Sequence, residues 1–381
     1  MTDPRVKIGG SRQTNPEHAV HELADQLNQP DIGLVIIFIS SHFDPALIEA
    51  ALNNYFGHAT VIGCTTAGEI GSAGYHDGSL SGLSIHRDDI NYEVAVMEHL
   101  STIDSHDCLM FAHKLKEALQ LRAAEARADN TFALMLIDGL CTREEMVSRA
   151  FYDGLGGLPL VGGSAGDDQA FRQTRVLCKG RFVSDAAVLV VATTPFLFEV
   201  FKTQHFVSGS ERLIVTAALP ERRIVTEING CPAAEEYART VGMAVAQLNS
   251  QVFATHPVIV RVGNTDFVRA IQKMNPDGSL TFFCAIDEGI VFKMAKAVSM
   301  TDNLEITLDN LQQRIGQPAL ILCFDCILRL IEATQLGLCN QIGSLLADSN
   351  AVGFSTYGEQ YGGMHINQTF TGVAIGKGRR A

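Results

Sequence analysis

The sequence contains no apolar run long enough to cross a membrane. Its longest apolar runs, such as residues 34–39 and 186–192, fall far short of the roughly 20 residues that a membrane helix requires. The polar segment 1–13 has no apolar stretch followed by a small-residue cleavage site, which argues against export. The nine cysteines are scattered, a pattern that favours reduced thiols over a disulfide framework. We therefore expect a cytoplasmic protein with no membrane partner.

Positive charge is also scarce. The chain has 29 lysines and arginines against 42 aspartates and glutamates, which gives a formal net charge of −13. Basic residues gather only at Arg222 and Arg223 and near the C-terminal end, at Lys377, Arg379 and Arg380. Because binding to nucleic acid depends on neutralising phosphates with lysine and arginine, we expect no nucleic-acid partner. A homo-oligomer is compatible with this composition.

Motifs for nucleotides and for zinc are absent from the sequence as well. No segment matches Gly-x-x-x-x-Gly-Lys-Ser/Thr, and none has Gly-x-Gly-x-x-Gly between a strand and a helix, so ATP and NAD sites are not indicated. Cys323 and Cys326 form a C-x-x-C pair, but no second pair is suitably spaced for zinc and no histidine follows for a c-type haem. We interpret these two cysteines as packing residues, with a redox role as the alternative.

What the sequence does contain is one unit that occurs three times. Each copy has the pattern of a strand, a helix, a second strand that ends in a glycine turn, and a third strand. The copies cover residues 33–85, 131–192 and 318–375, with helices expected at 45–56, 142–155 and 327–346. In the second helix, Thr142 and Glu145 have the spacing of a capping box. The opening strands are continuously apolar, which is typical of strands covered on both faces.

These repeats predict an α/β fold with α+β layering, built from three related strand-helix-strand-turn-strand units. We expect the first two units in an N-terminal domain and the third in a C-terminal domain. The predicted division is an N-terminal extension at 1–30, the two domains at 31–222 and 223–376, and a tail at 377–381.

Four segments carry a resemblance to a known family. They are Val61-Ile-Gly-Cys-Thr-Thr-Ala-Gly-Glu69, Val161-Gly-Gly-Ser-Ala-Gly-Asp167, Val225-Thr-Glu-Ile-Asn-Gly-Cys-Pro-Ala-Ala-Glu-Glu-Tyr237, and Tyr357-Gly-Glu359 with His365-Ile-Asn-Gln-Thr369. In this order the segments resemble the signatures of FIST sensory proteins, over nearly the whole chain. The resemblance implies a small-ligand sensor that is not an enzyme and that regulates a histidine kinase or a cyclic-di-GMP enzyme.

The glycine turns are the candidate ligand site. Their backbone N–H groups and neighbouring hydroxyls could hold a bound group, and each turn ends in an acidic residue. The alternative is that the glycines merely permit positive φ at strand exits. The candidate ligand-binding residues are Gly63, Cys64, Thr65, Gly68, Glu69, Gly162, Gly163, Ser164, Gly166, Asp167, Tyr357, Gly358, Glu359 and Asn367.

A narrower resemblance concerns haem. Gln204-His-Phe206, the segment 222–230 and Phe324-Asp-Cys-Ile-Leu-Arg329 resemble haem-binding nitric-oxide sensors of the NosP type. This resemblance implies haem b as a cofactor, with His205 as the first candidate for the iron ligand and His365 as the second. Phe206 would line the porphyrin, and Arg329 would pair with a propionate or a buried acid.

Three functions therefore stand side by side. The first is a haem-containing sensor of nitric oxide. The second is a sensor of a small metabolite, such as an amino acid, without haem. The third is an enzyme with Cys64 as its nucleophile, although a lone cysteine after an apolar strand is more often a buried packing residue.

Overall fold

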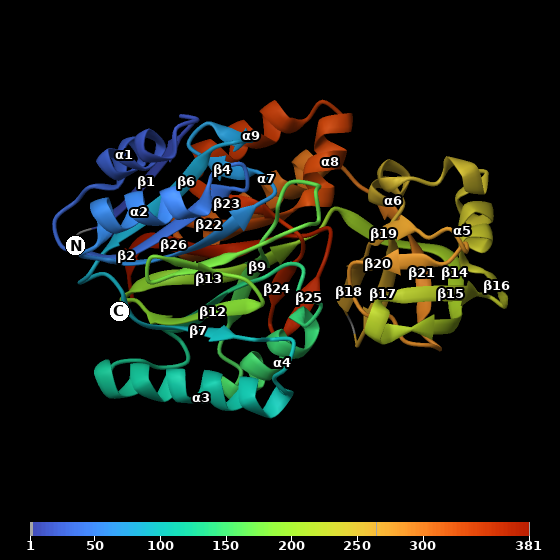
Figure 1. Cartoon of the computed structure of the whole chain (residues 1–381), viewed down its shortest axis with the longest axis horizontal. Coiled ribbons are helices and arrows are strands. Elements are labelled where there is room, and N and C mark those ends of the chain that lie inside the picture. The colour runs from blue at the N-terminus through green and yellow to red at the C-terminus, as the bar shows by residue number, and fades with distance from the viewer. Residues whose placement is uncertain (1–2, 264, 381) are drawn as a thin grey trace.

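The computed structural model describes residues 3–263 and 265–380, and it confirms the mixed α/β fold class. A large body contains three related units, and a smaller lobe formed by residues 206–298 projects from one side of it (Figure 1). We call this lobe the inserted domain, because the third unit continues on both sides of it.

The three units have the same order of elements. Unit one consists of β1 (Val6–Ser11), α1 (Pro16–Leu27), β2 (Ile32–Ser40), α2 (Pro45–Phe56), β3 (Thr60–Thr66), β4 (Glu69–Gly71), β5 (Gly74–His76) and β6 (Leu80–His86). Unit two consists of β7 (Asn91–Glu98), α3 (Ser105–Arg122), β8 (Thr131–Ile137), α4 (Glu144–Gly154), β9 (Leu160–Ser164), β10 (Val176–Cys178), β11 (Arg181–Val183) and β12 (Ala186–Thr193). Unit three consists of β13 (Phe196–Thr203), α7 (Met300–Ile315), β22 (Pro318–Cys326), α8 (Ile327–Gln335), α9 (Cys339–Asp348), β23 (Ala351–Thr356), β24 (Glu359–Tyr361), β25 (Met364–Ile366) and β26 (Phe370–Arg379).

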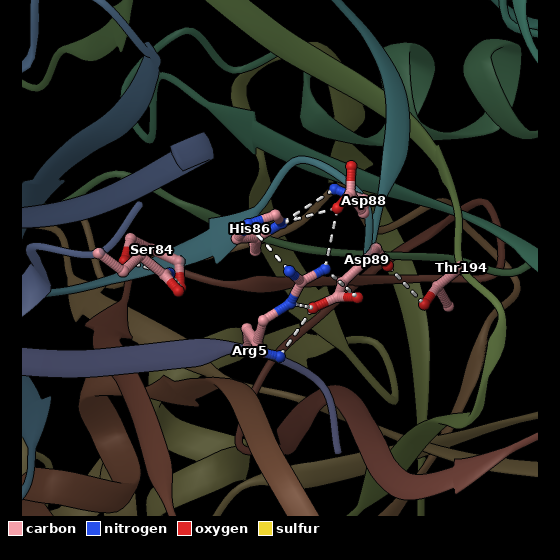
Figure 2. Close-up of polar contacts among 7 residues, drawn as sticks. Arg5, Ser84, His86, Asp88, Asp89 and Thr194 are labelled. Atoms are coloured by element: carbon pink, nitrogen blue, oxygen red, sulfur yellow. Dashed lines mark hydrogen bonds and ion pairs between the residues drawn. The ribbon is translucent and has the colours of Figure 1, made fainter. Parts of the chain in front are cut away.

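Each unit therefore begins one strand and one helix earlier than the repeat in the sequence indicates. In unit one these elements are β1 and α1, which lie in the segment expected to be an extension. Strand β1 pairs with β6 along its whole length. Arg5, just before β1, binds the buried carboxylate of Asp89 through both its side chain and its backbone N–H, and its guanidinium also contacts His86 and Asp88 (Figure 2). These contacts fix the first strand to the end of β6.

The hairpin that follows each glycine turn joins the sheet of another unit. Hairpin β4–β5 of unit one pairs with β23 of unit three, β24–β25 of unit three pairs with β9 of unit two, and β10–β11 of unit two pairs with β3 of unit one. This cyclic exchange gives the body an approximate threefold arrangement. It brings the three glycine turns toward the same place.

The body has a layered core. The inner faces of the three sheets pack on one another around aromatic side chains such as Phe38, Phe324 and Phe354. Helices cover the outer faces: α1 and α2 on the first sheet, α3 and α4 on the second, and α7 and α9 on the third. The opening strands are thus covered on both sides, as their continuous apolar sequences predict.

The inserted domain has its own sheet and core. It comprises β14 (Phe206–Leu219), β15 (Ile224–Ile228), β16 (Cys231–Pro232), α5 (Ala233–Val241), α6 (Ser250–Thr255), β17 (Val258–Val262), β18 (Thr265–Arg269), β19 (Ile271–Met274), β20 (Leu280–Phe282), β21 (Val291–Ala297) and the short 3₁₀ helices at 220–222 and 245–247. Its core surrounds Tyr237 and Phe253. The boundary expected between residues 222 and 223 lies between β14 and β15, which pair with each other.

Two local predictions were wrong. The helix expected over 327–346 is divided into α8 and α9, because Gly337 between them adopts a left-handed conformation with φ of 69°. The capping box of α4 does not form: Thr142 has φ of 54°, and the N-cap residue is Arg143, which makes no side-chain capping bond. Among the described residues, no helix is both long and apolar enough to span a membrane.

Candidate functional site

The three glycine turns meet at the centre of the body. In each turn, one backbone N–H group donates a hydrogen bond to a backbone carbonyl oxygen in the turn of another unit. The accepting residue stands two positions before the residue that is equivalent to the donor. The three hydrogen bonds are Ala67 N to Ser355 O at 3.0 Å, Tyr357 N to Ser164 O at 3.1 Å, and Gly166 N to Thr65 O at 3.0 Å. The turns are therefore bound into a ring by their own backbone.

The first glycine of each turn is required by the packing of the strands. A Cβ atom at Gly63 would lie 2.0 Å from the carbonyl oxygen of Ile37 in the neighbouring parallel strand, and one at Gly162 would lie 1.9 Å from that of Met135. Gly163 faces inward, where a Cβ atom would lie 2.7 Å from the side chain of Thr356. These three glycines are needed because other atoms of the protein lie too close for a side chain. This explains them by packing, without a role in ligand binding.

The two glutamates at the ends of the first and third turns form hydrogen bonds within the protein. The Glu69 carboxylate accepts hydrogen bonds from Thr66, 3 residues away, and from the backbone and hydroxyl of Ser79. Glu359 makes the same contacts with Thr356 and Thr369. Burial raises the pKa of Glu69 to about 7 and that of Glu359 to about 8, against the opposing effect of these hydrogen bonds. Neither carboxyl group is free to hold a ligand.

The second turn uses its acidic residue differently. The Asp167 carboxylate accepts hydrogen bonds from the backbone N–H groups of Phe171, Arg172 and Gln173, and from the hydroxyl of Tyr357. The ring of Tyr357 stacks on that of Phe171, with centroids 4.5 Å apart. Asp167 therefore fixes Tyr357 and the loop of unit two in place.

Cys64 lies in the central core of the body. Its side chain is fully buried among apolar residues, and burial raises the pKa of its thiol well above the ordinary value. A nucleophilic cysteine needs the opposite shift, because the thiolate is the reactive form. The surroundings of Cys64 suit a packing residue.

His205 belongs to a buried chain of charged and polar groups. Its Nδ1 atom lies 2.7 Å from an Nη1 atom of Arg329, and its Nε2 atom lies 2.8 Å from a carboxylate oxygen of Glu332. Arg329 also donates to Asp325 at 2.6 Å, and Asp325 accepts from the hydroxyl of Tyr75. Asp325, Arg329 and Glu332 belong to unit three, and Tyr75 belongs to the hairpin of unit one that joins its sheet. His205 lies where the chain enters the inserted domain.

This geometry does not fit haem at His205. Arg329 can only donate, so Nδ1 of His205 must accept and Nε2 must carry the proton. Burial, with the arginine charge acting in the same direction, lowers the pKa of the ring. An iron ligand needs a free nitrogen on an apolar wall, whereas both ring nitrogens here are engaged beside a guanidinium. Phe206 packs on the His205 ring at a centroid distance of 4.2 Å.

The hairpin of unit three contains a group of buried polar atoms without partners. We call the group Gln360, His365, Asn367 and Gln368 the amide cluster. Among the residues that the structure describes, none forms a hydrogen bond with Nε2 of His365, Oε1 of Gln360 or Gln368, or either amide atom of Asn367. The ring of His365 lies directly on Gly358, where a Cβ atom would be 2.2 Å from Cε1 and 3.1 Å from Nδ2 of Asn367. There is no room for a porphyrin between these groups, so His365 does not fit haem either.

A cleft of about 540 Å³ opens where the units and the inserted domain meet. We call it the central cleft. Its walls come from unit one, the loop of unit two, helix α6 of the inserted domain and helix α8 of unit three. The lining residues are His42, Ala67, Asp77, Asp168, Gln169, Ser250, Gln251, Ile327, Leu330, Ile331, Thr334 and Gln335. Ala67 and Asp168 belong to the first and second turns.

The turns also form one wall of an apolar contact with the inserted domain. Ala67 and Tyr357 pack in a single cluster with Ala254 and Phe283 of the inserted domain and with Ile327 of α8. Asp168, at the rim of the cleft, accepts from Ser41 at 2.9 Å and contacts Nε2 of His42 at 3.2 Å. The structure brings the three turns together beside the cleft, but none of the predicted ligand-binding residues is among its lining residues. Gly68 comes near it, beside Asp77 and Leu330 of the lining.

An ion-pair contact that the sequence did not reveal joins the two parts of the chain. Arg223 of the inserted domain lies 2.6 Å from carboxylate oxygens of both Glu144 and Glu145 of α4. Burial raises the pKa of Glu144 to about 7, against the effect of Arg223, while Glu145 also accepts from the backbone N–H of Ala285. Arg223 lies in the segment 222–230, which resembles haem-binding nitric-oxide sensors. No pattern in the sequence indicated that it would pair with Glu144 and Glu145.

Within residues 3–263 and 265–380, no group of three or more histidine, cysteine, aspartate or glutamate side chains is arranged to hold a metal ion.

A model of the FIST N domain matches residues 33–231, and a model of the FIST C domain matches residues 233–362. No curated protein matches the chain. Among solved structures, cyanuric acid hydrolase from A. caulinodans has 10% identity over 53% of this chain and 72% of that chain, with a TM-score of 0.32. Another cyanuric acid hydrolase, described as an evolutionary innovation by structural concatenation, has 9% identity over 98% of this chain and 100% of that chain, with a TM-score of 0.39.

Proposed function

The chain belongs to the FIST family of sensory domains, and from that premise we propose that it senses a small metabolite, such as an amino acid, bound in the central cleft. The observation that carries the proposal is the position of the cleft. It lies beside the ring of glycine turns, and both the body and the inserted domain contribute to its walls.

The lining of the cleft suits a small molecule with an ammonium group, a hydrogen-bonding polar group and an apolar part. Asp77 and Asp168 would attract an ammonium group, and the amides of Gln169 and Gln251 offer hydrogen bonds. Side chains of α8, such as Leu330, provide an apolar surface opposite them. A free amino acid with an apolar side chain offers an ammonium group to the aspartates, an apolar part to α8 and a carboxylate that can accept hydrogen bonds from the two amides.

The position of α8 offers a route from ligand to signal. Residues such as Leu330 and Thr334 line the cleft, while Arg329 and Glu332 of the same helix hold His205, where the chain enters the inserted domain. A ligand that contacts α6 and α8 together would favour one placement of the inserted domain over others. Such a difference in affinity between conformations is what a sensor needs.

The proposal includes a partner, as the family resemblance implies. A histidine kinase or a cyclic-di-GMP enzyme would bind the chain and respond to the placement of the inserted domain. Binding of haem and a response to nitric oxide remain predictions from the resemblance to NosP-type sensors. The hydrogen bonds of His205 favour a metabolite over haem as the ligand.

The test is a thermal-shift screen of the common free amino acids against wild type and two tryptophan variants. Leu330→Trp fills the cleft, and Leu336→Trp places the same side chain at an exposed position, 59% accessible, beyond the end of α8. We expect at least one amino acid to raise the Tm of wild type and of L336W but not of L330W. A response of L330W equal to that of wild type, or no response to any amino acid, would contradict the proposal.

A further inference from the structure

A second hollow lies beside the central cleft, at the carboxyl ends of the parallel strands β2 and β3. We call it the strand-end pocket, and its volume is about 270 Å³. Its walls come from the end of β2, the segment that enters α2, the loop of unit two between β9 and β10, and β11. Thr65 and Asp167, two of the predicted ligand-binding residues, belong to its lining. The two hollows have His42 and Asp168 in common.

The inner wall of the strand-end pocket is apolar. Ile39, Phe43 and Ile48 are buried in the core between the first sheet and its helices, and Phe182 packs against that core. The backbone N–H of Phe182 donates to Glu49 of α2 at 2.6 Å, which fixes this wall. At roughly 30 Å³ for each water molecule, the volume corresponds to about nine waters, or to a ligand of about ten non-hydrogen atoms. Such a wall favours a ligand with a hydrophobic part.

Two arginines of the unit-two loop, Arg172 and Arg175, also line the strand-end pocket. Arg172 is exposed and Arg175 is half-buried. Their backbone N–H groups donate to Asp167 and Thr65, which fixes the loop. Within the two described stretches of the chain, neither guanidinium group forms an ion pair or a hydrogen bond. Although the chain has 42 aspartates and glutamates, these two cations are available for an external anion.

The two aspartates that line the pocket are bound by donors of the protein. The Asp167 carboxylate accepts from three backbone N–H groups of its own loop and from the hydroxyl of Tyr357. Asp168 accepts from Ser41 at 2.9 Å and contacts Nε2 of His42 at 3.2 Å. An anion in contact with the guanidinium groups would meet two positive charges directly and the aspartates at longer range, where solvent weakens the repulsion.

We propose that the strand-end pocket is a second binding site, for a small organic carboxylate with an apolar body. Its carboxylate would accept hydrogen bonds from Arg172 and Arg175, and its apolar part would contact Phe43 and Phe182. Arginine suits this role because its planar guanidinium group can donate two parallel hydrogen bonds to one carboxylate. The proposal does not depend on the function proposed for the central cleft.

Inorganic phosphate is another anion that two arginines can hold. It would leave the apolar wall formed by residues such as Phe43 and Phe182 without a partner, whereas a carboxylate with a hydrophobic body covers this wall and removes apolar surface from water. The apolar wall therefore favours the organic anion, and competition between the two anions is part of the test.

The test measures binding of benzoate by isothermal titration calorimetry, with benzamide as the uncharged molecule of the same shape. Wild type should bind benzoate about tenfold or more tightly than benzamide, because hydrogen bonds between charged groups are stronger than those to a neutral amide. Arg172→Met and Arg175→Met each keep an apolar side chain and remove a charge, and each should weaken benzoate binding by about tenfold. Arg222→Met changes an exposed arginine of the inserted domain and should leave the Kd as in wild type.

Four outcomes would overturn the proposal: no binding of benzoate to wild type, equal affinity for benzamide, displacement of benzoate by an equal concentration of inorganic phosphate, or wild-type affinity in the double variant of Arg172→Met and Arg175→Met. L330W, which fills the central cleft, should bind benzoate as wild type does. Loss of benzoate binding in L330W would place benzoate in the central cleft and would also contradict the proposal. Failure of the amino-acid screen leaves these expectations unchanged, so the two proposals are tested separately.

Discussion

Nδ1 of His205 accepts a hydrogen bond from the guanidinium of Arg329 across 2.7 Å, and neither side chain is more than 1% exposed. The contact connects the entry of the inserted domain to α8, whose other residues line the central cleft. It makes His205 a link between the body and the inserted domain. The same contact occupies the nitrogen that an iron atom would need.

Removal of His205 should destabilise the fold. His205→Ala leaves Glu332 buried without its hydrogen-bond donor, and a buried charge that loses its partner costs about 2–4 kcal/mol. Urea unfolding measures the difference. His113→Ala is the control, because that histidine is 42% exposed on α3, where it pairs with Glu117; it should change the free energy of unfolding by less than about 0.5 kcal/mol.

The haem hypothesis has its own spectroscopic test. Protein expressed with a haem precursor should show no Soret band that depends on His205, because both ring nitrogens are already hydrogen-bonded. The measurement compares absorption spectra of wild type and His205→Ala before and after nitric oxide. A Soret band in wild type that disappears in the variant would restore His205 as an iron ligand.

Arg223 should control how firmly the inserted domain is attached. Arg223→Ala leaves Glu144, which is 2% exposed, without its cation, at an expected cost of about 3 kcal/mol at the interface. Hydrogen exchange and limited proteolysis within residues 206–298 should both become faster. Arg222→Ala changes the exposed neighbouring arginine and should leave both rates as in wild type; equal rates for R223A and R222A would contradict the role of this contact.

The buried Glu359 should make stability depend on pH. Burial raises its pKa to about 8 in the folded protein, against about 4.3 in an unfolded chain. Between these values the folded state binds more protons, so this contribution to stability is complete at low pH and is lost as the pH rises through about 8. Glu359→Gln keeps the hydrogen bonds of the protonated acid and removes the titration.

Urea unfolding at pH 5.5 and 7.5 measures this effect. The stability of wild type relative to E359Q should fall by about 2–3 kcal/mol between the two values. Glu69→Gln should show the same direction over a narrower window, because burial raises the pKa of Glu69 to about 7. A difference between wild type and E359Q that does not change with pH would show that Glu359 is ionised throughout.

Local patterns predicted the units well, because each element is specified by nearby residues. The helix expected over residues 45–56 is α2 with the same bounds, and the continuous apolar runs are the covered central strands. The exchange of hairpins between units could not be predicted from the sequence. Ile70 pairs with Gly353, 283 residues away, and a short three-residue strand gives no signal of a partner so distant.

The candidate site was predicted in part for the same reason. Repetition of the turns indicated a common place, and the hydrogen bonds of Ala67, Tyr357 and Gly166 create it. The sequence could not distinguish Glu359, which is held by two threonines, from Asn367, whose amide has no hydrogen-bond partner in the described part of the chain. That difference depends on how each side chain is surrounded after folding.

Hydrogen exchange with and without the amino acid that gives the largest thermal shift tests the central claim most directly. The account predicts that the ligand slows exchange in α8, over residues 327–335, and at the start of α6, because both helices line the central cleft. Slower exchange confined to other segments, with α6 and α8 unchanged, would place the ligand elsewhere and contradict the account.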